Sequence, residues 1–196
     1  MRNVALFVED FAHETFLRAM VQRLGKEHHL EVAFRPYSVR GGFGKVVKEL
    51  RLFLSDLECG RRELPDLLIV GRDANCQGHQ KRRRELEAVA ANCGCHVVYA
   101  IPDPHIERWL LLDSAAFKAV LGRGCDVPQQ KCERRRFKRL LLEAVRTAGV
   151  TPLLGGIEYT EKLVKAMDLR RLESADESLC RMLKDLRTIF KTWEQA

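Results

Sequence analysis

Short apolar runs alternate along the first hundred residues with segments whose apolar positions recur every three or four residues. The run over 3–8 predicts a strand buried on both faces. The apolar residues within 12–27 share one face and predict a helix. By the same patterns, further strands are expected over 30–37, 66–70 and 95–101, and further helices over 45–58 and 79–92. This order predicts an α/β fold, a mainly parallel four-stranded sheet flanked by helices.

The pattern after residue 104 is helical. A short apolar helix is expected over 106–112, with Trp109 in the core, and the last helix, over 175–193, carries one apolar stripe. We therefore expect an α/β core over 1–112 and a helical C-terminal extension over 113–196 packed on that core. No apolar run approaches the roughly 20 residues that cross a bilayer, so no membrane association is expected.

Basic residues exceed acidic ones and occur in blocks. The net charge is +7, and blocks lie at 81–84 and 131–139. Such blocks attract phosphate backbones because binding releases condensed counterions, although each block alone is also typical of a solvated helix face. The glycine-rich loop 41–44, followed by Lys45, is either a phosphate-binding loop or a turn. Beside acidic motifs, the two basic blocks favour nucleic acid as the partner.

The seven cysteines are odd in number and scattered, which favours reduced thiols and a cytoplasmic location. The N-terminal apolar stretch is too short for a signal peptide, which agrees with that location. Five cysteines and histidines raise a zinc-stabilised adaptor as a weaker alternative, but their spacing is not that of a zinc ribbon or finger. These residues are Cys76, His79, Cys93, Cys95 and His96.

Acidic and amide residues follow three of the expected strands. Glu9 follows the first, Asp73 and Asn75 follow the third, and Glu107 follows the fourth. The carboxyl ends of parallel strands meet at one edge of a sheet, so these side chains should converge. Gathered carboxylates repel, and a divalent cation such as Mg²⁺ offsets the repulsion. The alternatives are turn formation by Asp and Asn and helix-dipole stabilisation by Glu107. His13 is expected to be exposed at a helix start.

Several motifs resemble those of Toprim domains. The segment 4–24 is similar to their opening strand, glutamate and helix, and 72–75 is similar to their Asp-x-Asp motif. More closely, the chain resembles a bacterial Toprim-like family, similar to the Toprim nucleases paired with ABC-type (OLD-like) ATPases in phage defence. Its Gly-Gly-x-Gly and Glu-x-Trp-Leu-Leu motifs correspond to 41–44 and 107–111. The likeness spans most of the chain, with the best motifs in 4–112.

This resemblance implies a nuclease that hydrolyses DNA or RNA phosphodiester bonds with Mg²⁺ or Mn²⁺. Glu9, Asp73 and Glu107 would be catalytic, and Glu9, Asp73 and Asn75 would bind the metal. The residues expected to hold the nucleic-acid backbone are Lys45, Arg72, Lys81, Arg82, Arg83 and Arg135.

Two departures from the Toprim pattern leave a second interpretation open. Asp10 stands where the family has glycine after its glutamate, and Asn75 replaces the second acid of Asp-x-Asp. An amide oxygen ligates Mg²⁺ without offsetting its charge. The alternative is therefore a catalytically silent, nucleic-acid-binding or regulatory subunit of an ATPase complex.

Overall fold

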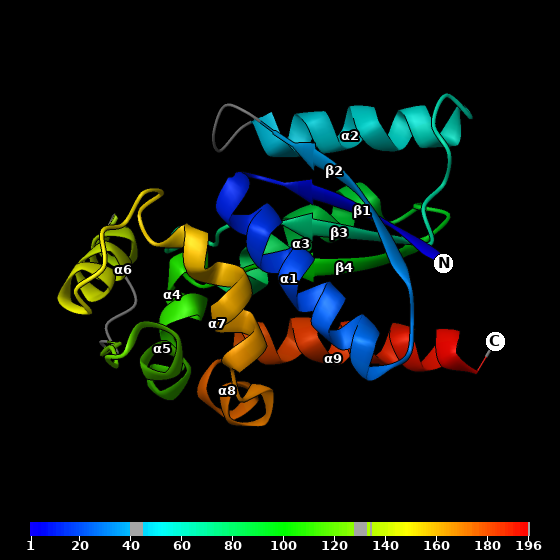
Figure 1. The fold of residues 1–196 in the computed structure, drawn as a ribbon. Coiled ribbons are helices and arrows are strands. Elements are labelled where there is room, and N and C mark those ends of the chain that lie inside the picture. The colour runs from blue at the N-terminus through cyan, green and yellow to red at the C-terminus, as the bar shows by residue number, and fades with distance from the viewer. Residues whose placement is uncertain (40–44, 128–132, 134, 196) are drawn as a thin grey trace.

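The computed structural model describes residues 1–39, 45–127, 133 and 135–195 (Figure 1). The glycine-rich loop 41–44 lies outside the described residues. A single four-stranded sheet has the order β2-β1-β3-β4, and every pair of neighbours is parallel. Its strands are β1 (Arg2–Val8), β2 (Val32–Ser38), β3 (Leu67–Gly71) and β4 (His96–Ala100). The predicted α/β class with a parallel four-stranded sheet is confirmed.

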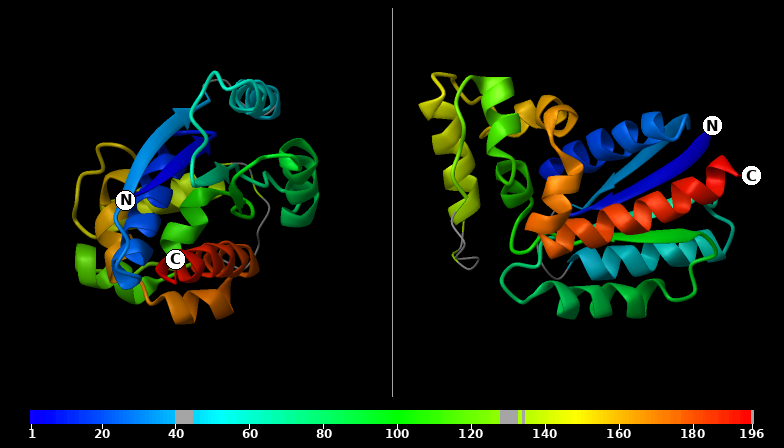
Figure 2. Two further views of the ribbon diagram at one scale, coloured as in Figure 1. Left: turned by 90° about the vertical axis from the view of Figure 1, so that its right-hand side faces the viewer. Right: turned by 90° about the horizontal axis from the view of Figure 1, so that it is seen from below.

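Helices cover both faces of the sheet (Figures 1 and 2). α1 (Phe11–Glu27) and α9 (Glu177–Glu194) cover one face, and α2 (Lys45–Glu58) and α3 (His79–Ala90) cover the other. The alternation of side chains along β1 explains the two layers. Leu6 is buried in the cluster under α1, whereas its neighbour Phe7 is buried against α2. A strand buried on both faces must be apolar throughout, as β1 is.

The remaining helices gather beyond the carboxyl ends of the strands and beside α1 (Figure 1). They are α4 (Ile106–Leu111), α5 (Ser114–Leu121), α6 (Arg136–Thr147), the 3₁₀ turn η1 (Ile157–Tyr159), α7 (Thr160–Ala166) and α8 (Leu169–Ala175). Their buried residues belong to the same apolar cluster as those of β1 and α1. The C-terminal helix α9 returns along the sheet beside β4 (Figure 2).

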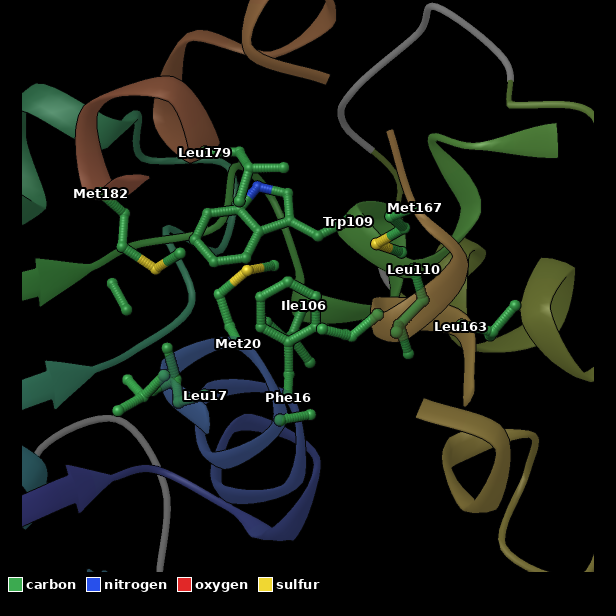
Figure 3. Close-up of a cluster of buried hydrophobic side chains, with 14 of the residues drawn as sticks. Phe16, Leu17, Met20, Ile106, Trp109, Leu110, Leu163, Met167, Leu179 and Met182 are labelled. Carbon is green, nitrogen blue, oxygen red and sulfur yellow. The ribbon is translucent and has the colours of Figure 1, made fainter. Parts of the chain in front are cut away.

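Trp109 is the centre of the packing between α1, α4 and α9 (Figure 3). Its side chain is fully buried, and its ring lies 5.4 Å from that of Phe16. The indole N–H donates to Ser178 Oγ at 3.1 Å and to Asp176 Oδ1 at 3.3 Å. A buried tryptophan needs such an acceptor, and Asp176 also caps α9. The prediction that Trp109 lies in the core is confirmed.

The cysteines depart from the expectation of reduced thiols at one position. Among the described residues, five cysteines are free and Cys76 is disulfide-bonded. The expectation is therefore wrong at Cys76, which has no thiolate to offer zinc. The free cysteines are Cys59, Cys93, Cys95, Cys125 and Cys180.

No helix within the described ranges is long and apolar enough to span a membrane. The cytoplasmic location stays a prediction.

Candidate acidic site at the carboxyl edge of the sheet

Glu9 and Asp73 meet where β1 and β3 end. The backbone N–H of Glu9 donates to Gly71 O at 3.0 Å, which continues the pairing of the two strands by one residue. The Glu9 carboxylate then accepts from the backbone N–H of Asp73 at 3.2 Å. Burial and the Asp73 charge raise the pKa of Glu9. The two acids therefore lie within electrostatic reach of each other, as predicted from the strand ends.

Asp73 is a buried carboxylate held by the beginning of α4. Its Oδ1 accepts from the backbone N–H of Ile106 at 2.9 Å, and its Oδ2 lies 2.9 Å from His105 Nδ1. Burial alone would raise the pKa of Asp73, but the charges and hydrogen bonds of His13 and His105 outweigh it and lower the pKa. Asp73 is therefore an anion at neutral pH, and it ties the loop after β3 to α4.

His13 belongs to the acidic site, although the sequence analysis predicted that its side chain would be exposed. It is fully buried in the first turn of α1, so the expectation of an exposed histidine is wrong. Its Nδ1 lies 2.8 Å from Asp10 Oδ1, and its Nε2 lies 3.1 Å from Asp73 Oδ1. Burial opposes its protonation, but the two carboxylates raise the pKa of His13 to about 10. An imidazolium therefore offsets Asp10 and Asp73.

The Glu107 carboxylate is only partly neutralised and hydrogen-bonded by the described residues around it. The residue is 4% exposed, and its Oε1 lies 3.6 Å from Lys138 Nζ. Its Oε2 is buried and has no hydrogen-bond partner among the described residues. Burial and the Asp73 charge raise the pKa of Glu107, although Lys138 opposes them. A buried carboxyl oxygen without a donor is available to a cation.

Asn75 lies in the loop after β3, close to the segment that follows β4. Its backbone has φ of 48°, and its N–H donates to Pro104 O at 3.1 Å. Its side-chain amide nitrogen lies 3.5 Å from the carbonyl oxygen of Asp73. Asn tolerates this left-handed conformation better than most residues, which agrees with the turn interpretation.

A cavity of about 570 Å³ opens beside the acids, between the beginning of α1, α4 and α6. Asp10 and Glu107 contribute the acidic part of its lining, and α6 contributes Lys138 and Arg139. Arg135, directly before α6, also lines it, together with apolar residues. The cavity is therefore lined mainly by apolar residues, with the basic side chains near α6 on one side and the carboxylates of Asp10 and Glu107 on the other.

Arg72 and Arg82 do not have the role expected of them. Each is only 1% exposed. The Nη1 of Arg82 lies 2.6 Å from Glu85 Oε2, and that of Arg72 lies 3.7 Å from the same oxygen. Their charges are directed inward, so they cannot contact a nucleic-acid backbone at the surface as predicted.

The other predicted backbone-binding residues are dispersed. Arg83 pairs with Glu87 at 2.7 Å and with Asp185 of α9 at 3.5 Å. Lys45 is exposed at the beginning of α2. Lys81 lines a separate cavity of about 740 Å³ between α3 and α9. Of the predicted basic residues, Arg135 is the one that lines the cavity beside Glu107.

Comparison with known proteins yields no match to a family model, a curated protein or a solved structure. The resemblance to Toprim nucleases therefore stays an expectation. Functional inference depends on the geometry of the acidic site.

Proposed function

We propose that the chain is a metal-dependent phosphodiesterase acting on nucleic acid, with Glu9, Asp73 and Glu107 as its site carboxylates. The observation that carries this proposal is the unpartnered buried oxygen of Glu107, whose charge interacts unfavourably with Asp73 and Asp10. Within the described residues, Glu107 Oε2 has no donor, and its carboxyl group is destabilised by Asp73. A bound cation would coordinate the unpaired oxygen of Glu107 and would also offset the repulsion between Glu107 and Asp73.

The charges of the site support a divalent cation. Asp10 and Asp73 share the imidazolium of His13. Among the described residues, Glu107 forms an ion pair with the half-exposed Lys138. The pKa values of Glu9 and Glu107 are both raised, first by burial and then by Asp73. Raised carboxyl pKa values in a group of buried acids are typical of functional sites that bind an opposite charge.

The donor set fits Mg²⁺ or Mn²⁺, because both take carboxylate oxygens. We assign the metal to Glu9 and Glu107, with Asp73 beside them. The structure contains no ready-made group of three or more His, Cys, Asp or Glu ligands among its described residues. The Glu9 and Glu107 side chains would therefore turn toward the ion as it binds. When bound, the metal would polarise a phosphate and favour ionisation of a water molecule.

The chain's own residues would position the substrate. Lys138 lies beside Glu107 and would contact a phosphate oxygen at the reacting phosphodiester. Arg139 and Arg135, on the same wall of the cavity, would hold the neighbouring phosphates of DNA or RNA. His13 and His105 would keep Asp73 ionised and fixed in orientation.

A cleavage assay tests this function. Wild-type protein, Glu9→Gln and Glu107→Gln are incubated with single- and double-stranded DNA and RNA, with Mn²⁺, Mg²⁺ or a chelator. We expect metal-dependent cleavage that falls at least about 100-fold in both variants, as losses at catalytic groups commonly do. Glu27→Gln removes an exposed helix-surface carboxylate and is the matched control. Cleavage that survives the chelator, or that neither site variant reduces, contradicts the proposal.

A second candidate is a catalytically silent subunit that binds nucleic acid for an ABC-type ATPase. It is favoured by Asn75, which stands in place of an acid, and by Asp73, whose two oxygens are both engaged by protein groups. This candidate predicts nucleic-acid binding without cleavage, weakened by Lys138→Ala and unchanged by Glu107→Gln. Stimulation of a co-expressed ATPase by the wild-type chain would add the expected partner.

A further inference from the structure

Two cysteines face each other at the opposite edge of the sheet from the acidic site. Cys93 and Cys95 lie between α3 and the first residue of β4, and their Sγ atoms are 2.9 Å apart. A disulfide bond measures about 2.05 Å, so a movement of roughly 0.9 Å would bring the sulfurs to bonding distance. The contact already orients the two side chains toward each other.

Small molecules have access to this pair. Both side chains are half-buried, and Gly94 between them is exposed. Cys93 lines a cavity of about 260 Å³ together with Leu57 and Glu58. A second hollow, of about 570 Å³, is lined by both cysteines. A reagent can therefore approach the pair from solvent.

The two thiols are chemically unequal. The hydrogen bond with Cys95 lowers the pKa of Cys93 to about 6 against the effect of burial. The same hydrogen bond, with burial, raises the pKa of Cys95. Cys93 is thus mainly thiolate at neutral pH, and Cys95 supplies the S–H that donates to it. A thiolate is the nucleophile in thiol–disulfide exchange, and a neighbouring thiol resolves the product.

We propose that Cys93 and Cys95 form a redox-active dithiol that low-molecular-weight disulfides oxidise to an intramolecular disulfide. The Cys93 thiolate attacks one sulfur of the small disulfide, forms a mixed disulfide and releases one small thiolate. Cys95 then gives its proton to solvent and attacks Cys93 Sγ, which releases the second small thiolate. The two cysteines lose two electrons, and the small disulfide gains them.

Gly94 makes the ring closure feasible. A disulfide across one intervening residue closes a small ring, and glycine gives the backbone the freedom to adopt it. A strained and accessible disulfide is also readily reduced. The product should therefore form reversibly, unlike a buried structural disulfide.

Peptide mapping tests the proposal on the full chain. The reduced protein is equilibrated with mixtures of oxidised and reduced glutathione, then alkylated and digested with trypsin. The tryptic peptide 85–108 contains Cys93 and Cys95 and no other cysteine, so Cys76 cannot confuse the result. We expect this peptide to lose two hydrogens and to escape alkylation as the mixture becomes oxidising, and to recover when it is reduced.

Variants separate exchange chemistry from a simple thiol contact. In Cys95→Ser, the resolving thiol is absent, so a glutathione adduct on Cys93 should replace the internal disulfide. In Cys93→Ser, the attacking thiolate is absent, so no internal disulfide forms, and any adduct on Cys95 should form more slowly than the adduct on Cys93 in Cys95→Ser, because burial still opposes ionisation of the Cys95 thiol. Exposed Cys59, in its own tryptic peptide, is the internal control. If Cys59 is glutathionylated while both cysteines of peptide 85–108 stay alkylatable, the proposal is wrong.

Discussion

The substitution Glu107→Gln should stabilise the metal-free protein. The wild-type carboxyl group is 4% exposed, with one oxygen 3.6 Å from Lys138 Nζ and the other without a donor among the described residues. An unsatisfied buried polar group costs about 1–3 kcal/mol, and a charged one costs more. Gln removes the charge and keeps the shape. Lys138, whose side chain is 55% exposed, is then solvated by water.

At pH 7, we expect the free energy of unfolding of Glu107→Gln to exceed that of the wild type by about 1–2 kcal/mol. This difference corresponds to a rise in Tm of roughly 2–8 °C for a domain of this size. The pH dependence has a definite sign. Because the folded state raises the pKa of Glu107 above 4.5, the folded protein binds the extra proton more readily than the unfolded chain. The wild-type penalty is therefore absent below that value and grows as the pH rises through the folded pKa. The advantage of the variant should vanish in acid.

Metal should reverse the order of stability. At a Mn²⁺ concentration 100 times its dissociation constant, binding stabilises the wild type by about 2.7 kcal/mol. The variant, with one carboxylate fewer, should gain much less. Thermal unfolding followed by circular dichroism, in chelator and in Mn²⁺, measures both effects, and Glu27→Gln is the control. A variant less stable than wild type in chelator, or an equal response of both proteins to Mn²⁺, would refute the reasoning.

Three further predictions concern stability and are measured by urea unfolding. The pKa of His13 is raised from 6.5 to about 10, so its protonation should contribute about 4 kcal/mol to the free energy of unfolding at pH 7 in chelator. Its replacement by Gln should therefore cost progressively less as the pH rises through 10, and a constant cost would contradict the paired imidazolium. Gly71→Ala should destabilise by about 1–3 kcal/mol, because a Cβ there lies 2.9 Å from Leu17 Cδ1. Gly94→Ala, with its nearest contact at 3.6 Å, should change stability by less than about 0.5 kcal/mol; equal costs at both glycines would refute the steric argument. Trp109→Phe, which removes a donor from two buried oxygens, should cost about 1–2 kcal/mol, and an unchanged midpoint would show that its hydrogen bonds contribute nothing.

The sheet was predictable from the sequence because parallel strands buried on both faces must be apolar runs. The run over 3–8 corresponds to β1, and the run over 66–70 corresponds to β3. The short helices α7 and α8 were not predicted. Each has seven residues, too few for a helical period to be recognised.

The positions of the acids followed from the topology, but their surroundings did not. Any residue directly after a parallel strand lies at the carboxyl edge, so Glu9 and Asp73 could be placed together. The pairing of His13 with Asp73 could not be anticipated, since the two residues are distant in the chain. Arg72 and Arg82 were misplaced because arginine side chains are usually solvated. Here Glu85 and the packing around it hold both inside the protein.

Anomalous diffraction from crystals soaked in Mn²⁺ would test the acidic site most directly. We expect a single strong peak at the carboxyl edge of the sheet, in contact with the carboxyl oxygens of Glu107 and Glu9. A site that stays free of Mn²⁺ at saturating concentration, with Glu107 unmoved beside Lys138, would contradict the proposed metal site.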